Sequence, residues 1–144
     1  MNNIARAMNF ATYAFRGKLD DEGKTYFKAH CLQVYNILKQ VTDDEDVLVA
    51  GLLHDIIEDT PYLHADLQAF FGKRVADLVN EVTHEGQADQ YGYYFPRLHS
   101  KEAILIKFAD RLSNLSRMGG WPKGRQRHYM TKSRFWRRSR EEKR

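Results

Sequence analysis

Apolar residues recur along most of this chain at the three- and four-residue spacing that is typical of amphipathic helices. Nearly every segment has this spacing, which predicts an all-α fold. The expected helices cover residues 2–16, 25–41, 65–71, 73–82 and 100–117, with a last helix from Pro122 toward Phe135 or Trp136. One more helix is expected from a cap at Thr42 or Asp43 to about Glu58, where Pro61 prevents its continuation.

One long segment interrupts the helical pattern. Residues 84–99 combine two glycines, a proline and three tyrosines, so they are expected to form a loop, which at this length is often functional. The sequence has no repeat, no low-complexity segment and no internal linker. We therefore expect a single helical domain over residues 1–144, with a basic tail from about residue 131.

The composition is that of an ordinary globular protein. Hydrophobic residues make up 42% and charged residues 29% of 144 residues, enough for one domain with a real core. The single cysteine, Cys31, excludes an internal disulfide and is expected in the core. No signal-like N-terminus and no apolar run near the roughly 18 residues of a membrane span are present, so a cytoplasmic location without membrane contact is predicted.

The net charge of +4 conceals an asymmetry between the body and the tail. Residues 123–144 hold ten Lys/Arg against two Glu, whereas residues 1–122 hold thirteen Lys/Arg against seventeen Asp/Glu. A basic tail of this kind attracts nucleic acid or another polyanion, or serves only as a solubilising end. The second role is the commoner one, so nucleic acid is not the favoured partner.

The candidate chemistry lies in an apolar segment that contains four ionisable residues. His54 and Asp55 are adjacent, and Glu58 and Asp59 follow one turn later. Charged groups on a buried helical face need a partner, and a divalent metal ion is such a partner. Helical domains build metal sites from ligands on facing helices. The expected ligands come from three helices and are His30, His54, Asp55 and Asp110.

This set of two imidazoles and two carboxylates leaves coordination positions open for water or a phosphate oxygen, as a catalytic ion requires. Mixed ligation of this kind suits Mn²⁺, Fe²⁺ or Zn²⁺ better than Ca²⁺. The sequence therefore predicts a metal-dependent hydrolase.

Further residues lie one turn from the expected ligands. Glu58 and Asp59 are placed to act on a water or a leaving group as general base or acid. Lys107 and Asn114, on either side of Asp110, are placed to contact phosphate and substrate. Each of these residues alone has an ordinary explanation, as a solvated helix end or an ion-pair partner. The metal-site hypothesis depends on their combination.

The segment from Ala50 to Thr60, with its pattern HDxxED, resembles the HD-domain signature of the RelA/SpoT-type guanosine tetraphosphate hydrolases, including the small single-domain alarmone hydrolases. The segments 70–75, 79–83 and 106–114, the last with the pattern KxADRxxN, resemble the same family in the same order. The similarity extends over roughly residues 5–130. It implies a helical HD-domain bundle and an Mn²⁺-dependent 3′-pyrophosphohydrolase that acts on the alarmone (p)ppGpp of the stringent response.

The resemblance also implies a role for individual positions. The family's metal ligands match His30, His54, Asp55 and Asp110. Glu58 and Asp59 match the acidic pair that acts on the attacking water, and Asn114 matches a nucleoside-contacting residue. Arg125 and Tyr129 look like the Arg and Tyr that reach the ligand from the last helix, where Arg pairs a phosphate and Tyr stacks or donates a hydrogen bond.

The chain departs from the family before the first ligand. The family carries a basic Arg-Lys-x-Gly turn near the guanine, whereas the turn from Leu19 to Gly23 is acidic here. Cys31 stands where the family often has Pro, and the spacing from Gly23 to His30 differs. These changes concern guanine recognition and leave the metal site intact. The loop with Arg97 and its three tyrosines offers an alternative surface for stacking and phosphate binding.

Three hypotheses follow. The first is an alarmone hydrolase that removes pyrophosphate from (p)ppGpp or a related nucleotide. The second is an HD-domain nucleotidase that acts on a different nucleotide, a hypothesis that the acidic turn motivates. The third is a non-catalytic protein that binds nucleotide or nucleic acid, with Phe135 and Trp136 interleaved among the basic residues of the tail. The acidic pair Glu58-Asp59 argues against the third, because a binding protein needs no group that activates water.

Overall fold

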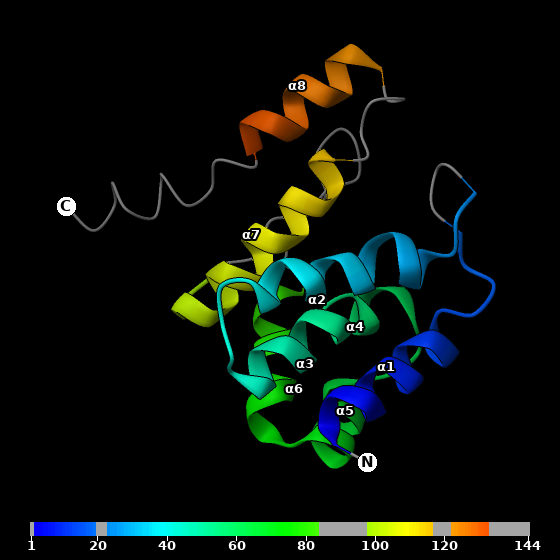
Figure 1. The fold of residues 1–144 in the computed structure, drawn as a ribbon, viewed down its shortest axis with the longest axis vertical. Coiled ribbons are helices and arrows are strands. Elements are labelled where there is room, and N and C mark those ends of the chain that lie inside the picture. Colours follow the sequence, from blue (N-terminus) through cyan, green and yellow to red (C-terminus); the bar gives the residue numbers. More distant parts are fainter. Residues whose placement is uncertain (1, 20–22, 84–97, 117–121, 133–144) are drawn as a thin grey trace.

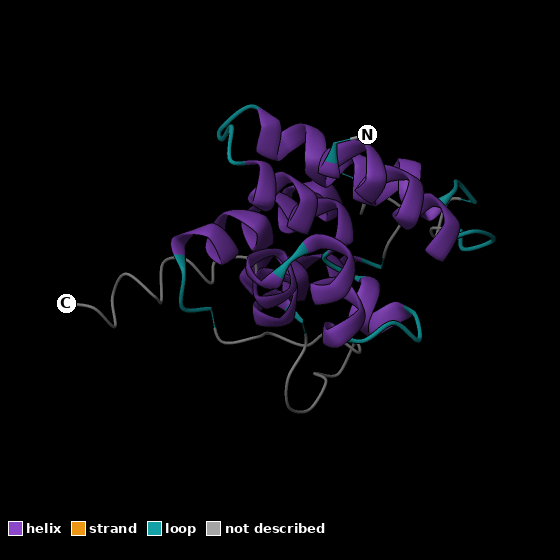
Figure 2. Ribbon diagram, turned by 90° about the horizontal axis from the view of Figure 1, so that it is seen from below, coloured by secondary structure: helices purple, strands orange, loops and turns teal. Residues whose placement is uncertain are grey.

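The computed structural model describes residues 2–19, 23–83, 98–116 and 122–132. Within these ranges the chain is helical, with a single isolated antiparallel bridge between Leu19 and Thr25, so the expected all-α class is confirmed (Figures 1 and 2). The elements are α1 (Asn3–Ala14), η1 (Phe27–Cys31), α2 (Leu32–Lys39), α3 (Glu45–Leu53), α4 (Ile56–Asp59), α5 (His64–Phe71), α6 (Lys73–Val82), α7 (Lys101–Leu115) and α8 (Lys123–Lys132). None of the helices in the described ranges has the length and apolar character needed to cross a membrane.

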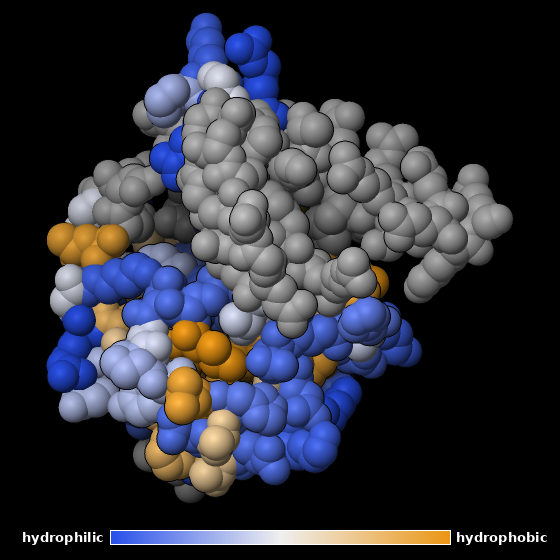
Figure 3. All heavy atoms as spheres, turned by 180° about the vertical axis from the view of Figure 1, so that it is seen from behind, coloured by the Kyte–Doolittle hydropathy of each residue, from blue (hydrophilic) through white to orange (hydrophobic). Residues whose placement is uncertain are grey.

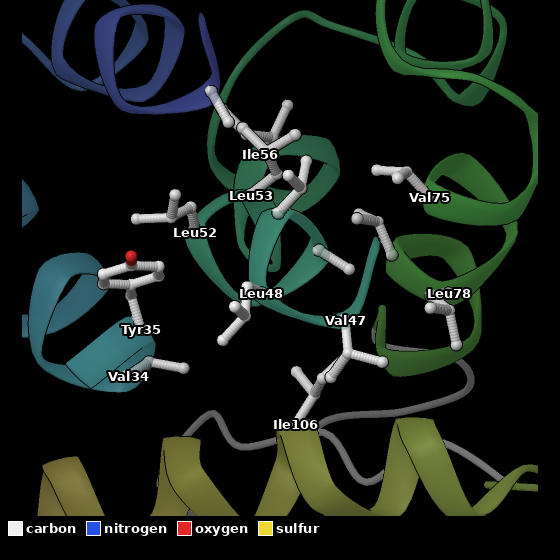
Figure 4. Packing of buried hydrophobic residues seen from close by; sticks show 14 of the residues in the cluster. Val34, Tyr35, Val47, Leu48, Leu52, Leu53, Ile56, Val75, Leu78 and Ile106 are labelled. Carbon is white, nitrogen blue, oxygen red and sulfur yellow. The ribbon is translucent and has the colours of Figure 1, made fainter. Parts of the chain in front are cut away.

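Helix α3 lies at the centre of the core. Every residue from Val47 to Leu53 is buried, because α1, α2, α6 and α7 pack around the helix. Figure 4 shows side chains of α3 between Val34 and Tyr35 of α2 on one side and Val75 and Leu78 of α6 on the other. A helix that is apolar on all faces is stable in water only when neighbours enclose it. The core therefore fixes the C-terminal end of α3, which carries His54.

Gly51 lets α2 approach α3 closely. A Cβ atom built at Gly51 would lie 2.4 Å from Cδ1 of Leu38, which is itself fully buried. Any larger residue would push α2 outward or displace the Leu38 side chain. The glycine thus sets the distance between α2, which follows His30, and α3, which ends just before His54.

Asp44 begins α3, which corrects the expected cap at Thr42 or Asp43. The Asp44 carboxylate accepts from the backbone N–H groups of Asp46 and Val47. Arg74 of α6 donates to both of its carboxylate oxygens, at 2.8 and 2.7 Å. Three consecutive polar residues are possible caps in the sequence, and the ion pair with Arg74, thirty residues away, favours this one.

The helix expected to reach Glu58 is interrupted at His54 and Asp55. Helix α3 ends at Leu53, and α4 begins at Ile56. The His54 ring lies 2.7 Å from the carbonyl oxygen of Gly51, which a continuous helix would use for the backbone N–H of Asp55. A side chain that competes for a backbone acceptor ends a helix. The interruption is the turn on which the His-Asp pair lies.

The helix expected over residues 25–41 also differs, because its first part, Phe27–Cys31, is a turn of π-helix. Such turns occur mostly at functional sites. His30 lies on this turn, and η1 packs against both α3 and α7.

Helices α5 and α6 form a hairpin around Gly72, whose positive φ of 97° no other residue type adopts easily. Helix α6 has the expected bounds, and α5 and α7 differ from expectation by a residue or two at their ends. Helix α8 lies beyond the end of α7, apart from the packed helices (Figure 1). Figure 3 shows a mostly hydrophilic described surface on the back of the molecule, with a few separate hydrophobic patches.

Candidate metal centre

The structure brings the four expected metal ligands together from three separate parts of the chain. His30 lies on η1, His54 and Asp55 lie at the junction of α3 and α4, and Asp110 lies on α7. Single donor atoms of His30, His54 and Asp110 all lie within 4.8 Å of one another. The mutual packing of η1, α3 and α7 produces this convergence.

The donor atoms surround one point. The Nε2 atoms of His30 and His54 are 3.0 Å apart. Oδ1 of Asp110 lies 2.8 Å from Nε2 of His30 and 3.3 Å from Nε2 of His54. Oδ2 of Asp55 lies 3.1 Å from Nε2 of His54 and 3.5 Å from Nε2 of His30. Ligands bonded to one ion at about 2.0–2.2 Å have separations of this size.

The interruption between α3 and α4 explains how two adjacent residues face one centre. On a continuous helix, neighbouring side chains point about 100° apart. Here Asp55 has left helical geometry, with φ −98° and ψ 2°, so its carboxylate turns toward the His54 ring. The sequence pattern placed both residues on one helix, and the structure corrects that placement while keeping the two side chains together.

The protonation of His54 suits metal binding. Its Nδ1 atom lies 2.7 Å from the Gly51 carbonyl oxygen, which can only accept, so Nδ1 carries the proton. Its Nε2 atom therefore faces the other donors, where it would offer its lone pair to a bound cation in place of a proton. Two buried carboxylates beside two imidazoles need compensating positive charge, which protons or a metal ion can supply, and the residues present fit a divalent metal ion.

Burial makes the charges of this centre strongly interdependent. His30, His54 and Asp110 are 1%, 3% and 6% exposed. Burial alone would raise the pKa of Asp55 and Asp110, but their cationic neighbours outweigh it and hold both pKa values below the usual range; for Asp110 the largest of these is Lys107. Burial likewise lowers the pKa of His54, yet the charge of Asp55 and the hydrogen bond to Asp110 raise it well above its usual value. The two acids stay ionised and available to a cation.

Lys107 and Tyr26 contact the carboxylates from outside the cluster. Nζ of Lys107, a side chain that is itself buried, lies 3.4 Å from Oδ2 of Asp110. The Tyr26 hydroxyl donates to Oδ2 of Asp55, and burial and the Asp55 charge raise the pKa of Tyr26 well above its usual value. The sequence reasoning identified Lys107 and missed Tyr26, although Tyr26 precedes His30 by one helical turn and this spacing was available as a signal.

Two more residues behind His30 were also missed. Nδ1 of His30 lies 2.9 Å from Oγ of Ser113, which in turn lies 2.7 Å from Oε1 of Gln33. Ser113 follows Asp110 by three residues on α7, and Gln33 follows His30 by three residues. The helical spacing links both to expected ligands, but serine and glutamine are too common for the spacing alone to single them out.

Glu58 and Asp59 lie on α4, directly after the His-Asp turn. Asp59 forms an ion pair with Lys18 at 2.8 Å, and burial followed by the charge of Asp55 raises its pKa. A carboxyl group with a raised pKa beside a charged cluster has the properties of a general acid or base. Lys18 directly precedes the acidic turn, and the sequence reasoning assigned it no role.

The structure describes some of the remaining expected substrate contacts and not others. Asn114 is half-buried near the end of α7, and Arg125 is half-buried on α8. The Tyr129 side chain and the whole of Arg97 lie outside the described residues. The roles of all four residues stay predictions.

A surface cavity of about 780 Å³ lies beside η1. Its lining includes two lysines and several polar side chains of η1, α2 and the end of α7, among them Lys24, Lys28, Gln33, Asn36 and Ser116. Cavities of this size hold drug-sized ligands. The lining residues Ala29 and Gln33 lie on either side of His30 in the sequence, so the cavity is next to the element that carries the first ligand.

Comparisons with known proteins agree with this architecture. The sequence matches the HD domain family over residues 7–102. It is 33% identical over 130 residues to the bifunctional (p)ppGpp synthase/hydrolase SpoT of Escherichia coli K12, covering 83% of this chain and 18% of SpoT. A guanosine-3′,5′-bis(diphosphate) 3′-pyrophosphohydrolase of Spiroplasma citri is also 33% identical over 130 residues, covering 83% of this chain and 17% of that protein. The chain thus spans less than a fifth of the length of these relatives.

A solved structure is similar over nearly the whole chain. It is that of a metazoan ortholog of SpoT that hydrolyses ppGpp, with a TM-score of 0.78 and 27% sequence identity. The similarity covers 93% of this chain and 83% of the other. A Listeria monocytogenes protein is 31% identical, with a TM-score of 0.59 over 72% of this chain.

Proposed function

We propose, from the premise that this chain belongs to the HD domain family, that it is a divalent-metal-dependent hydrolase that removes pyrophosphate from the 3′ position of (p)ppGpp. The observation that carries the proposal is the convergence of donor atoms of His30, His54 and Asp110 within 4.8 Å of one another, with Oδ2 of Asp55 at 3.1 Å from Nε2 of His54. A ppGpp-hydrolysing structural relative that matches 93% of the chain supports the choice of substrate. Removal of pyrophosphate from a nucleotide is a reaction that a site of this composition can catalyse.

The four ligands would hold the ion through the Nε2 atoms of His30 and His54 and through the carboxylates of Asp55 and Asp110. When bound, the ion supplies positive charge beside a phosphoryl oxygen and lowers the pKa of a nearby water. We propose Mn²⁺, with Fe²⁺ or Zn²⁺ as alternatives, because all three accept mixed imidazole and carboxylate ligation.

Glu58 and Asp59 are proposed to handle the proton of the attacking water. Both carboxylates follow the His-Asp turn within one turn of helix, and the charge of Asp55 acts on Asp59. The ion pair with Lys18 restrains the Asp59 carboxylate. We assign the acceptance of the proton to Glu58. Asp59 is then the group that orients the water or donates to the leaving group.

The phosphates are proposed to bind through cations near the centre. Lys107 lies against Asp110 and adds positive charge at the buried end of the site. The cavity beside η1 has room for a nucleotide and carries Lys24 and Lys28 at its edge. Asn114, Arg125, Tyr129 and Arg97 are proposed as further contacts to the nucleoside and its phosphates.

The acidic turn favours a second candidate, an HD-domain nucleotidase that acts on another nucleotide. Asp20, Asp21 and Glu22 repel phosphate and replace the basic residues that the family uses near guanine. Nucleic-acid binding by the tail stays a prediction, because residues 133–144 lie outside the described part of the chain. A cytoplasmic location stays a prediction as well.

The proposal is tested by incubating the purified chain with Mn²⁺ and ppGpp and measuring the released pyrophosphate. We expect stoichiometric release of pyrophosphate and GDP, abolished by Asp55→Ala and by chelation of the metal. Deoxynucleoside triphosphates and nucleoside monophosphates in parallel reactions separate the two candidates. Turnover of those nucleotides with none of ppGpp would replace the alarmone hydrolase by the nucleotidase.

A further inference from the structure

A chain of three hydrogen-bonded side chains leads from the surface to the far side of the His30 ring. Oγ of Ser113 lies 2.7 Å from Oε1 of Gln33 and 2.9 Å from Nδ1 of His30. Ser113 is 0% exposed, and His30 is 1% exposed. Gln33 is half-buried and lines the cavity beside η1.

The direction of these hydrogen bonds follows from the number of protons that each side chain can donate. A serine hydroxyl has one proton to donate, and here it points to the amide oxygen of Gln33, which can only accept. Ser113 Oγ therefore meets His30 as an acceptor, and Nδ1 of His30 must supply the proton of that hydrogen bond. A neutral imidazole with its proton on Nδ1 has a lone pair on Nε2, the atom that faces His54 and Asp110.

The elements explain why these two residues can act on one ring. Ser113 and Asp110 lie three residues apart on α7, so the same helix face offers a ligand to the cluster and an acceptor to the ring behind it. Gln33 lies on the first turn of α2, directly after the π-helical turn that carries His30. The packing of α2 on α7 brings Gln33 to Ser113.

We propose that Ser113 and Gln33 are positioning residues that hold His30 in the Nδ1–H tautomer and so keep its Nε2 atom available to the divalent cation. The inference rests on the proposed metal site. It extends the site by two residues that are not themselves metal ligands. Groups in such positions around metal-binding histidines fix the tautomer and the ring orientation, and their loss lowers metal affinity by about 10–100-fold.

The first test is Ser113→Ala, which removes the acceptor while filling almost the same space. In metal-free protein, long-range ¹H–¹⁵N correlation spectra of the His30 ring report directly which nitrogen carries the proton. We expect a proton on Nδ1 in the wild type, whether or not Nε2 also carries one beside Asp110, and a partial or complete loss of the Nδ1 proton in the variant. Titration calorimetry with Mn²⁺ should show an affinity lower by about 10-fold or more. An unchanged tautomer together with an unchanged Mn²⁺ affinity would overturn the proposal.

The second test uses Gln33, because its half-buried position lets it be replaced without opening a cavity in the core. A carboxylate can only accept a hydrogen bond, so Gln33→Glu keeps the direction of the chain, whereas Gln33→Met removes the acceptor at similar size. We expect Gln33→Glu to retain the tautomer and the Mn²⁺ affinity, and Gln33→Met to lose part of both. A greater loss of tautomer and Mn²⁺ affinity in Gln33→Glu than in Gln33→Met would mean that Gln33 donates to Ser113 and that the proposed direction of the hydrogen bond is wrong.

The two proposals fail in different ways. A wild type that binds no Mn²⁺ but has the Nδ1–H tautomer would refute the metal site and retain the positioning role of Ser113 and Gln33 on the ring. A wild type that binds Mn²⁺ with all three variants equal to it in affinity and tautomer would retain the metal site and refute the positioning role. Far-ultraviolet circular dichroism of each variant verifies that its helices are intact.

Discussion

The chemistry of the candidate metal centre depends on which atoms of its side chains carry protons. The His54 ring donates from Nδ1 to the Gly51 carbonyl, which leaves Nε2 for a metal. Asp55 and Asp110 remain ionised despite burial, because cationic neighbours, including Lys107, favour their charged forms. A buried group of this composition is unstable without a cation, and this instability is the physical basis of its proposed affinity for one.

Glu58→Gln separates the role of a water-activating carboxylate from that of a ligand. The amide cannot accept a proton from water, so we expect kcat for pyrophosphate release to fall by about 100-fold or more while Mn²⁺ affinity stays within a factor of two or so of the wild type. Asp55→Ala is the matched comparison, since it should lose both Mn²⁺ affinity and pyrophosphate release. The measurements are initial rates and calorimetric titration, and full activity of Glu58→Gln would assign water activation to another group.

The sequence predicted the ligand residues better than it predicted their surroundings. The adjacent His-Asp pair and the downstream Asp110 stand out because ionisable residues are rare in apolar segments, and the structure brings their side chains together with His30. Tyr26, Ser113 and the other supporting residues are of common types whose roles depend on which helices pack together. Helical spacing relates these residues to the expected ligands, but the spacing alone does not single them out.

Individual elements were predictable where their own residues determine them. The apolar spacing of α6 gave both of its ends, because Gly72 and the amphipathic pattern are local signals. The π-turn at Phe27–Cys31 and the interruption at His54 were missed. The interruption accompanies a contact between the His54 ring and the Gly51 carbonyl oxygen, which the spacing of apolar residues does not reveal. The same holds for the cap of α3, where Arg74 favours Asp44 over its polar neighbours.

Variants of Asp44 separate capping from the ion pair at the start of α3. Asp44→Ala should lower the free energy of unfolding by about 0.5–2 kcal/mol, because it removes the cap. Asp44→Asn keeps a capping side chain and loses the ion pair with Arg74, which at this exposure contributes up to about 1 kcal/mol. Urea unfolding of the three proteins at pH 7 measures both differences. Equal stability of Ala and Asn variants would show that the cap contributes nothing.

The ion-pair contribution should also depend on pH in a defined direction. Hydrogen bonds from Arg74, the largest cause, lower the pKa of Asp44 in the folded state. The difference in stability between wild type and Asp44→Asn is therefore fully present above the unfolded-state pKa of about 3.9 and is lost as the pH falls through the lower folded-state pKa. Unfolding curves between pH 7 and pH 3 measure this loss. A difference that grows on acidification would contradict the assigned pair.

Gly51→Ala tests the close approach of α2 and α3. Alanine favours a helix by about 1 kcal/mol over glycine, yet the new Cβ would meet Leu38 at 2.4 Å in a filled core. We expect a net loss of about 1–3 kcal/mol of stability from overpacking. In a Leu38→Ala background the same change should cost much less, as a double-mutant cycle measures. An equal loss of stability in both backgrounds would mean that the Leu38 side chain does not limit the approach of α2 to α3.

The whole molecule is organised so that the metal centre joins segments far apart in the chain. Binding at a point shared by η1, the α3–α4 junction and α7 requires the native packing of all three. A ligand that binds only the folded state stabilises it, by about 2.7 kcal/mol at a hundred times its Kd. At the scale of the domain, metal binding and folding are therefore linked.

Thermal unfolding with and without Mn²⁺ measures this linkage. Saturating Mn²⁺ should raise the Tm of the wild type by several degrees, about 3–5 °C for each kcal/mol in a chain of this size. His54→Ala should lose the shift. His64→Ala is the matched control, because His64 lies at the surface and pairs with Asp77, and it should keep the shift. The same shift in His54→Ala would place the stabilising ion elsewhere.

The central claim is that one divalent cation binds between His30, His54, Asp55 and Asp110, and anomalous X-ray scattering from crystals grown with Mn²⁺ tests it most directly. The account predicts a single strong manganese peak within about 2.0–2.3 Å of the two Nε2 atoms and of an oxygen from each carboxylate. Strong manganese peaks only at other places on the protein, or none at all at saturating Mn²⁺, would contradict it.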